Sequence, residues 1–132
     1  MNYSEQKNME IAGMKFSHMD LFDLVCTALN GGISYWAGVD NGTDEWKNIT
    51  GDGLEEKFFN ILLNGGKVKL YDDSEEQYED EDFPWFITLE SLKDGIRITI
   101  EEEEWDGDVD EHDAETADCI FQNAIFGELV FG

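Results

Sequence analysis

The first half of the chain carries apolar residues at two spacings, and each spacing predicts an element. Between residues 18 and 30 they recur every three or four positions, as on one face of a helix: Met19, Phe22, Val25, Cys26 and Leu29. Ser17 is a suitable N-cap, Asp20 places an acid in the first turn, and Asn30-Gly31-Gly32 supplies a left-handed stop. Residues 33–39 are aromatic and β-favouring, so we expect a strand there.

The same succession of helix, turn and strand is expected a second time. A helical pattern over residues 53–63 ends at Asn64-Gly65-Gly66, and residues 67–71 read as a strand. Leu-Asn-Gly-Gly thus ends both helices, at positions 29–32 and 63–66. Because glycine tolerates the positive φ of a sharp turn, we interpret the repeat as a recurring helix-to-strand turn rather than a duplicated binding loop.

A strand and a helix are expected after an acidic stretch in mid-chain. Residues 85–87 favour a strand, and Thr88 can cap a helix that begins at Leu89. The apolar face of that helix would hold Leu92, Ile96 and Ile100. The residues Ile96, Ile98 and Ile100 also alternate as in a strand, and Gly95 weakens both interpretations. We prefer the helix.

The last helix has the clearest pattern in the chain. Asp113 is a strong N-cap, and the apolar stripe that follows consists of Ala117, Ile120, Phe121, Ala124 and Ile125. Gly127 ends this helix, and residues 128–131 can add a short terminal strand.

These elements predict a single α+β domain of about four helices packed with a small sheet of three or four short strands, with acidic loops. A chain of 132 residues, 41% of them hydrophobic and 13% aromatic, suits one domain with a real core. Residues 1–13 are polar without a clear period, so we expect them to form a lead-in that can be disordered. A single acidic domain is expected over residues 14–132.

Cysteine usage and hydropathy give no sign of export. Cys26 and Cys119 lie in expected helices without metal-ligand spacing, so we expect two reduced thiols. No stretch approaches the length of a membrane span, and the N-terminus lacks the order of a signal peptide. We therefore expect the protein in the cytoplasm of the cell that makes it, without contact to a membrane.

The net charge of the chain is the feature that says most about its partners. The chain has 32 acidic and 8 basic residues, a formal charge of -24. Eight carboxylates lie between Asp72 and Asp82 and ten between Glu101 and Glu115, and neither stretch contains a lysine or arginine. Such a field repels nucleic acid and attracts cationic surfaces. A charge run can also be a solvated loop that improves solubility, and both interpretations stay open here.

Metal binding and catalysis find less support. Asp106, Asp108 and Asp110 copy positions 1, 3 and 5 of a calcium loop, but Glu111 stands where glycine is needed and Ala117 where a bidentate Glu is needed. Among so many acids, chance carboxylate pairs are expected, and the chain has no nucleophile motif, Walker loop or dinucleotide fingerprint. The histidines, His18 and His112, have no partner in the sequence pattern. We expect no enzyme activity, no metal and no cofactor.

Two segments carry a family resemblance. They are Thr27-Ala28-Leu29-Asn30-Gly31-Gly32-Ile33-Ser34-Tyr35-Trp36 and Gln122-Asn123-Ala124-Ile125-Phe126-Gly127-Glu128-Leu129-Val130-Phe131-Gly132. The chain resembles, over about residues 14–132, small acidic proteins encoded by bacteriophages and prophages of Gram-positive bacteria. That resemblance implies a phage context and an α+β fold and assigns no catalytic residue. The acidic run at 72–82 and the N-terminus are longer here than in the family pattern.

By analogy with other small acidic phage proteins, the chain is similar to anti-CRISPR and anti-restriction inhibitors. The expected function is that of an acidic nucleic-acid mimic, a phage-encoded inhibitor that occupies the basic nucleic-acid site of a bacterial defence nuclease or effector complex in the host cytoplasm. Carboxylates accept the same arginine forks as phosphate. The expected contact residues are Asp72, Asp73, Glu75, Glu76, Tyr78, Glu79, Asp80, Glu81, Asp82, Glu101, Glu102, Glu103, Glu104, Asp106, Asp108, Asp110, Glu111 and Asp113. The alternative is a small-molecule-sequestering or phage accessory or structural protein whose acids serve solubility.

Overall fold

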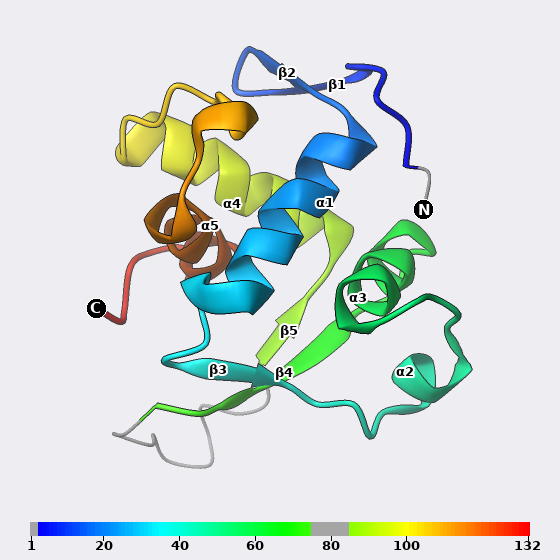
Figure 1. Ribbon diagram of the computed structural model, residues 1–132. Helices are drawn as coiled ribbons and strands as arrows, with labels where there is room; N and C mark the ends of the chain where they lie inside the picture. Colours follow the sequence, from blue (N-terminus) through cyan, green and yellow to red (C-terminus); the bar gives the residue numbers. More distant parts are fainter. Residues whose placement is uncertain (1–2, 75–84) are drawn as a thin grey trace.

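The computed structural model describes residues 3–74 and 85–132 and shows an α+β domain (Figure 1). Its elements in chain order are β1 (Met9–Ile11), β2 (Met14–Phe16), α1 (His18–Thr27), a π-helical turn (Ala28–Gly32), β3 (Ala37–Val39), α2 (Asp44–Asn48), α3 (Leu54–Leu63), β4 (Val68–Asp72), β5 (Trp85–Ile87), α4 (Leu89–Glu102), a 3₁₀ turn (Val109–Glu111) and α5 (Ala114–Phe126). The expected fold class and four long helices are confirmed.

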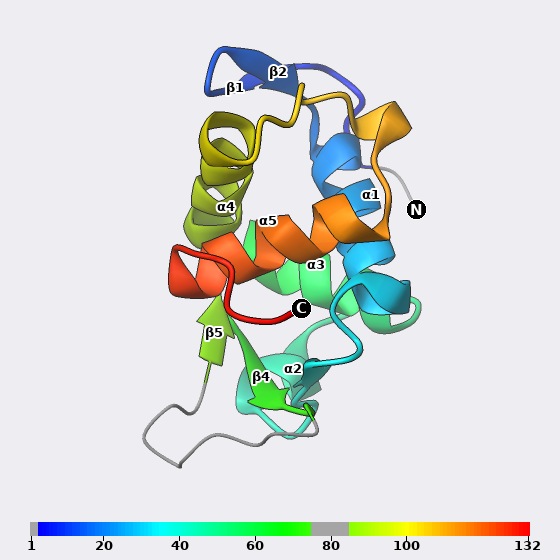
Figure 2. The same ribbon diagram turned by 90° about the vertical axis from the view of Figure 1, so that its left-hand side faces the viewer.

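Two antiparallel sheets lie at opposite ends of the molecule, with α1, α3, α4 and α5 between them (Figures 1 and 2). The larger sheet has the order β3-β4-β5, with Leu70 paired to both Val39 and Trp85. Val68, Leu70 and Ile87 alternate inward and are buried, as the period of a half-buried strand requires. The small sheet is the hairpin β1-β2.

The helix expected from Leu89 forms as α4, and α5 begins where its N-cap Asp113 predicts. Gly95 has a packing reason, since a Cβ there would meet the Ile120 carbonyl oxygen at 2.3 Å and Ala124 Cβ at 2.8 Å. The glycine that weakened the sequence pattern is therefore what lets α4 approach α5 closely.

The two Leu-Asn-Gly-Gly turns differ. At Gly65 φ is +80°, the left-handed stop that was expected, whereas α1 ends earlier, at Thr27, and continues as the π-helical turn. The strand expected over 33–39 is correspondingly short: Trp36 and Ala37 donate backbone hydrogen bonds to the Ile33 carbonyl, so 33–36 is a turn and pairing begins at Ala37.

Both ends of the domain pack differently from expectation. Within the expected lead-in, Tyr3 lies 4.7 Å from Phe22 and 4.8 Å from Phe59 between ring centroids, and Ile11 is buried in the β1-β2 hairpin. At the other end no strand forms over residues 128–131, because the Gln122 side chain accepts the backbone N–H groups of Val130 and Phe131 at 2.7 and 2.8 Å. Side-chain capture replaces strand pairing there.

The core fills the space between the helices and the inner face of the larger sheet. Its largest fully buried side chains include Trp36, Phe16, Phe58, Phe59 and Phe121. Within residues 3–74 and 85–132, none of the helices has both the length and the apolar content to cross a lipid bilayer.

Candidate partner-binding surface

The second acidic stretch forms the link between α4 and α5, and we call residues 101–113 the acidic connection. It lies beside the β1-β2 hairpin, at the end of the molecule remote from the larger sheet (Figures 1 and 2). The chain leaves α4 through two hydrogen bonds to the Thr99 carbonyl, from the backbone N–H groups of Glu103 (3.1 Å) and Trp105 (3.3 Å). Positive φ values of 59° at Glu104 and 80° at Gly107 then turn it toward α1.

Three side chains other than the acids anchor the acidic connection to the body of the domain. Val109 is 7% exposed and belongs to the core. The Trp105 ring lies 6.2 Å from that of Phe16. His112 bridges its own turn and α1, with Nδ1 contacting the Val109 carbonyl oxygen and Nε2 lying 2.7 Å from Thr27 Oγ1. The backbone that carries the carboxylates is thus fixed at its middle as well as at its ends.

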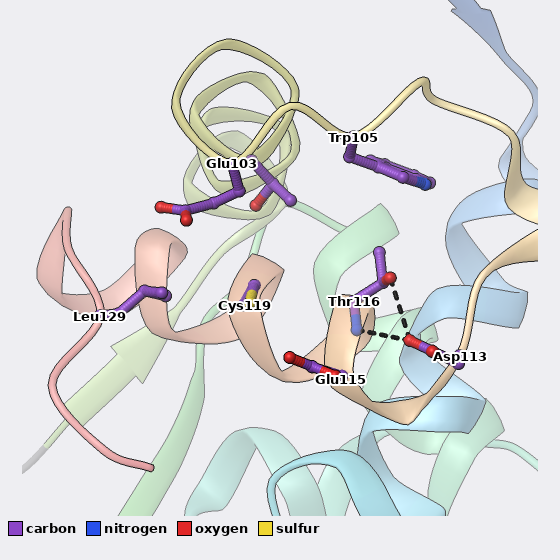
Figure 3. Close-up of a pocket in the computed structure, with 8 residues that line it drawn as sticks. Glu103, Trp105, Asp113, Glu115, Thr116, Cys119 and Leu129 are labelled. Atoms are coloured by element: carbon purple, nitrogen blue, oxygen red, sulfur yellow. Dashed lines mark hydrogen bonds between the residues drawn. The ribbon is translucent and has the colours of Figure 1, made fainter.

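Several carboxylates stabilise the local turns of the connection. The Oδ1 atoms of Asp106 and Asp108 accept the backbone N–H groups two residues on, at 3.0 and 3.1 Å. Asp113 Oδ1 accepts the N–H and hydroxyl of Thr116 as the N-cap of α5 (Figure 3). Those hydrogen bonds from Thr116 lower the pKa of Asp113, so it stays ionised at neutral pH.

All the expected contact carboxylates of this stretch are exposed: Glu101, Glu102, Glu103, Glu104, Asp106, Asp108, Asp110, Glu111 and Asp113. Glu101 forms an ion pair with Arg97 at 2.8 Å on the surface of α4. Exposed pairs of this kind contribute about 0.3–0.5 kcal/mol, so a basic partner can displace Arg97. The connection presents a dense anionic surface on an ordered backbone.

The first acidic stretch is described only at its start. Asp72 is 7% exposed, and its Oδ1 accepts the N–H and hydroxyl of Ser74 at 2.8 and 2.5 Å, which shapes the chain as it leaves β4. Asp73 is exposed, and its N–H donates to the Trp36 carbonyl at 2.9 Å. The remaining expected contacts lie outside the described residues: Glu75, Glu76, Tyr78, Glu79, Asp80, Glu81 and Asp82.

The two stretches are not brought together where both are described. Asp72 and Asp73 follow β4 at the larger sheet, whereas the acidic connection lies across the helices from that sheet (Figure 1). Each therefore has to be judged as a separate surface.

A groove lies beneath the acidic connection, between α4, α5 and the C-terminal tail. One hollow of about 340 Å³ is lined by Thr99, Glu103, Trp105, Asp113, Glu115, Thr116, Cys119 and Leu129 (Figure 3). A second, of about 430 Å³, shares Glu103 and Leu129 and adds Asn123 and Glu128. Sequence reasoning missed Thr99 and Asn123. Their spacing in the sequence could have identified them, because Thr99 lies three residues after Ile96 and Asn123 three residues after Ile120. Each is therefore a polar residue next to the apolar face of its helix.

Cys119 in this groove is a weak nucleophile. Burial, together with the charges of Asp118, Glu103 and Glu115, raises the pKa of its thiol. The thiolate is the reactive form of cysteine, so this thiol remains protonated at neutral pH. Both cysteines are free and half-buried.

Within the described part of the chain, no group of three or more His, Cys, Asp or Glu side chains could hold a metal ion. The calcium-like spacing of Asp106, Asp108 and Asp110 instead builds successive turns, in which the first two carboxylates each accept a backbone N–H.

No family model matches the chain, and neither the curated proteins nor the solved structures give a match.

Proposed function

We propose that this protein is an inhibitor that docks its acidic connection into the nucleic-acid site of a basic protein. The observation that supports this most is nine exposed carboxylates on a backbone anchored by Val109, Trp105 and His112. A fixed anionic array loses less side-chain and backbone freedom on binding than a flexible acidic tail. By the resemblance of the sequence to small phage proteins, the proposed partner is a bacterial defence nuclease or effector complex in the host cytoplasm.

The physical basis is competition for arginine and lysine. Duplex DNA carries one charge per roughly 1.7 Å of axis, and carboxylates on neighbouring residues of an extended chain, about 3.3 Å apart, approach that density. A carboxylate accepts both N–H groups of an arginine fork as a phosphate does. Direct binding of this chain to nucleic acid is not part of the proposal, because its charge of -24 repels a polyanion.

The test neutralises carboxylates at the surface while leaving those that build turns. The neutral variant carries Glu101→Gln, Glu104→Gln, Asp110→Asn and Glu111→Gln. A charge-matched control carries four exposed substitutions elsewhere: Glu5→Gln, Asp44→Asn, Asp52→Asn and Glu90→Gln. Both have the same net charge, so a difference between them reports position and not total charge.

Affinity capture from bacterial lysate, at low and then moderate salt, supplies the partner, and competition with DNA or guide RNA is measured on the purified pair. We expect the wild type and the control to compete with nucleic acid, the neutral variant to lose at least tenfold in affinity, and binding to weaken with salt as screening rises. Equal competition by the neutral variant, or a captured protein indifferent to nucleic acid, would refute the proposal.

A further inference from the structure

Asn123, which lines the groove beneath the acidic connection, carries a hydrogen-bond acceptor that no donor of the described residues reaches. Asn123 is 2% exposed, and its Nδ2 donates to Thr99 Oγ1 at 3.1 Å. The Thr99 hydroxyl in turn donates to the Gly95 carbonyl oxygen at 2.7 Å, which fixes the orientation of the amide. Asn123 Oδ1 has no hydrogen-bond partner within the described residues. A buried acceptor without a donor destabilises the fold, so a donor that reached it would bind favourably.

The position of this oxygen relates it to the groove. Asn123 lines the 430 Å³ hollow and its partner Thr99 lines the 340 Å³ hollow, so the amide lies where the two meet between α4 and α5. Both hollows are of the size that accommodates small ligands or side chains, about 300–1,000 Å³.

The charge of the walls defines the donor. Carboxylates line both hollows: Glu102, Glu103, Asp113, Glu115 and Glu128. No lysine or arginine of the described chain lines either one. A neutral donor would leave this charge uncompensated, whereas a cationic donor would gain from it and from the acceptor together.

The groove also offers apolar surface. The indole of Trp105 flanks the first hollow opposite α5 (Figure 3), and Leu129 lines both hollows. A cation placed over a tryptophan face is attracted by the ring, and an aliphatic stem packs against leucine. Guanidinium suits this mixture better than ammonium, because it is planar, more weakly hydrated and carries five donors for several acceptors.

We propose that the groove binds one arginine side chain of the basic partner, with a guanidinium N–H donated to Asn123 Oδ1, Glu103 pairing with the charge, and the stem against Leu129 and Trp105. Because Oδ1 is shielded from solvent, the wall must yield slightly on binding. Leu129 lines both hollows and is 43% exposed, so its side chain can rotate to admit the guanidinium while Gln122 still holds the backbone at Val130 and Phe131. The identity of the arginine's source rests on the proposed function; the chemistry of the site does not.

The test uses the full chain and N-acetyl-arginine amide as probe, with the citrulline and lysine analogues for comparison. Amide ¹H–¹⁵N NMR follows the side-chain amide of Asn123 and the indole N–H of Trp105 during titration. We expect both signals to shift with a Kd on the order of 1 mM, as for a single anchored side chain. The citrulline and lysine analogues should bind at least fivefold more weakly. Equal binding of either analogue, or shifts confined to residues outside the groove, would refute the assignment.

Two variants sharpen the result. Glu103→Gln changes the exposed C-cap of α4 and should weaken the arginine probe at least fivefold, whereas Glu90→Gln, an exposed acid in the first turn of α4, should not. Asn123→Leu removes the acceptor and should abolish binding; its folding is checked by denaturation. An unchanged affinity in Glu103→Gln would count against the site even if Asn123→Leu failed to fold.

The outcomes separate this inference from the proposed function. If capture of a partner depends on the acidic connection but the arginine probe shifts no signal of the groove, the proposed function is supported and the arginine site is refuted. If the probe binds in the groove but no nucleic-acid-binding partner is captured, the groove is a site for free guanidinium compounds and the proposed function is refuted.

Discussion

The two acidic stretches look alike in sequence, yet the structure uses their described parts differently. In the acidic connection, Val109 is buried, Trp105 lies against Phe16, and every carboxylate stays exposed. At the end of β4, the first carboxylate, Asp72, is itself buried and bound to Ser74. Charge density alone therefore does not say which carboxylates are available to a partner.

What distinguishes the acidic connection is apolar residues within the charge run. Trp105 and Val109 interrupt the acids and turn inward, so that the acids between them are held outward. Burying a valine contributes about 1.5–3 kcal/mol relative to leaving it exposed. This offsets only part of the conformational entropy that is lost when several loop residues become ordered. The contact of His112 with Thr27 and the backbone N–H groups accepted by Asp106 and Asp108 supply further order.

The largest expected effect comes from separating the helices that carry both ends of the acidic connection. Gly95→Ala places a Cβ 2.3 Å from the Ile120 carbonyl oxygen. Helix propensity would gain about 1 kcal/mol, but overpacking against backbone costs about 3 kcal/mol, so we expect a net loss of roughly 2 kcal/mol. Urea denaturation measures it, with Lys93→Ala in the same helix as control. A stabilised Gly95→Ala would contradict the close packing of α4 on α5.

The next effect tests the anchor itself. Val109→Ala removes buried methyl groups from the connection and should lower the free energy of unfolding by about 2 kcal/mol. Val130→Ala makes the same chemical change at a residue 43% exposed and should cost less than about 0.5 kcal/mol. Chemical denaturation compares the two. Equal losses would mean that Val109 does not hold the connection in solution.

Local sequence signals predicted the starts of helices α4 and α5 correctly. Thr88 and Asp113 cap α4 and α5 where expected, because an N-cap depends on a few neighbouring atoms. Gly65 likewise gives the left-handed turn its sequence suggests. The β4 and β5 strands were also located from short β-favouring runs.

The misses depend on contacts between distant residues. The strand expected over 128–131 gives way to hydrogen bonds with Gln122, and the hairpin Met9–Phe16 and the five-residue helix α2 are too short for a clear period. At the site, exposure of the connection's carboxylates followed from their charge. The unsatisfied Asn123 oxygen did not, because only the pairing of α4 with α5 reveals it.

A smaller effect is expected at the sheet end of the comparison. Asp72→Ala removes an acceptor from the N–H and hydroxyl of Ser74 and should destabilise the fold by about 1 kcal/mol. Asp73→Ala removes an exposed carboxylate one residue on and should stay within about 0.5 kcal/mol of the wild type. Thermal unfolding of the pair measures the difference. A larger loss from Asp73→Ala would reverse the roles assigned to these neighbours.

The smallest effect is the pH-dependent difference between Asp113→Asn and the wild type, which separates capping from charge at the end of the acidic connection. Asp113→Ala should cost about 1 kcal/mol at neutral pH, as for other N-caps, through lost hydrogen bonds to Thr116. Because the folded-state pKa of Asp113 is lowered, its contribution is present above the unfolded value, about 3.9, and is lost as pH falls through the folded pKa. Asp113→Asn caps without titrating, so its stability relative to wild type should rise over that acidic window, measured by denaturation from pH 7 to pH 3. A constant difference between Asp113→Asn and the wild type would show that the ionised carboxylate adds nothing to the cap.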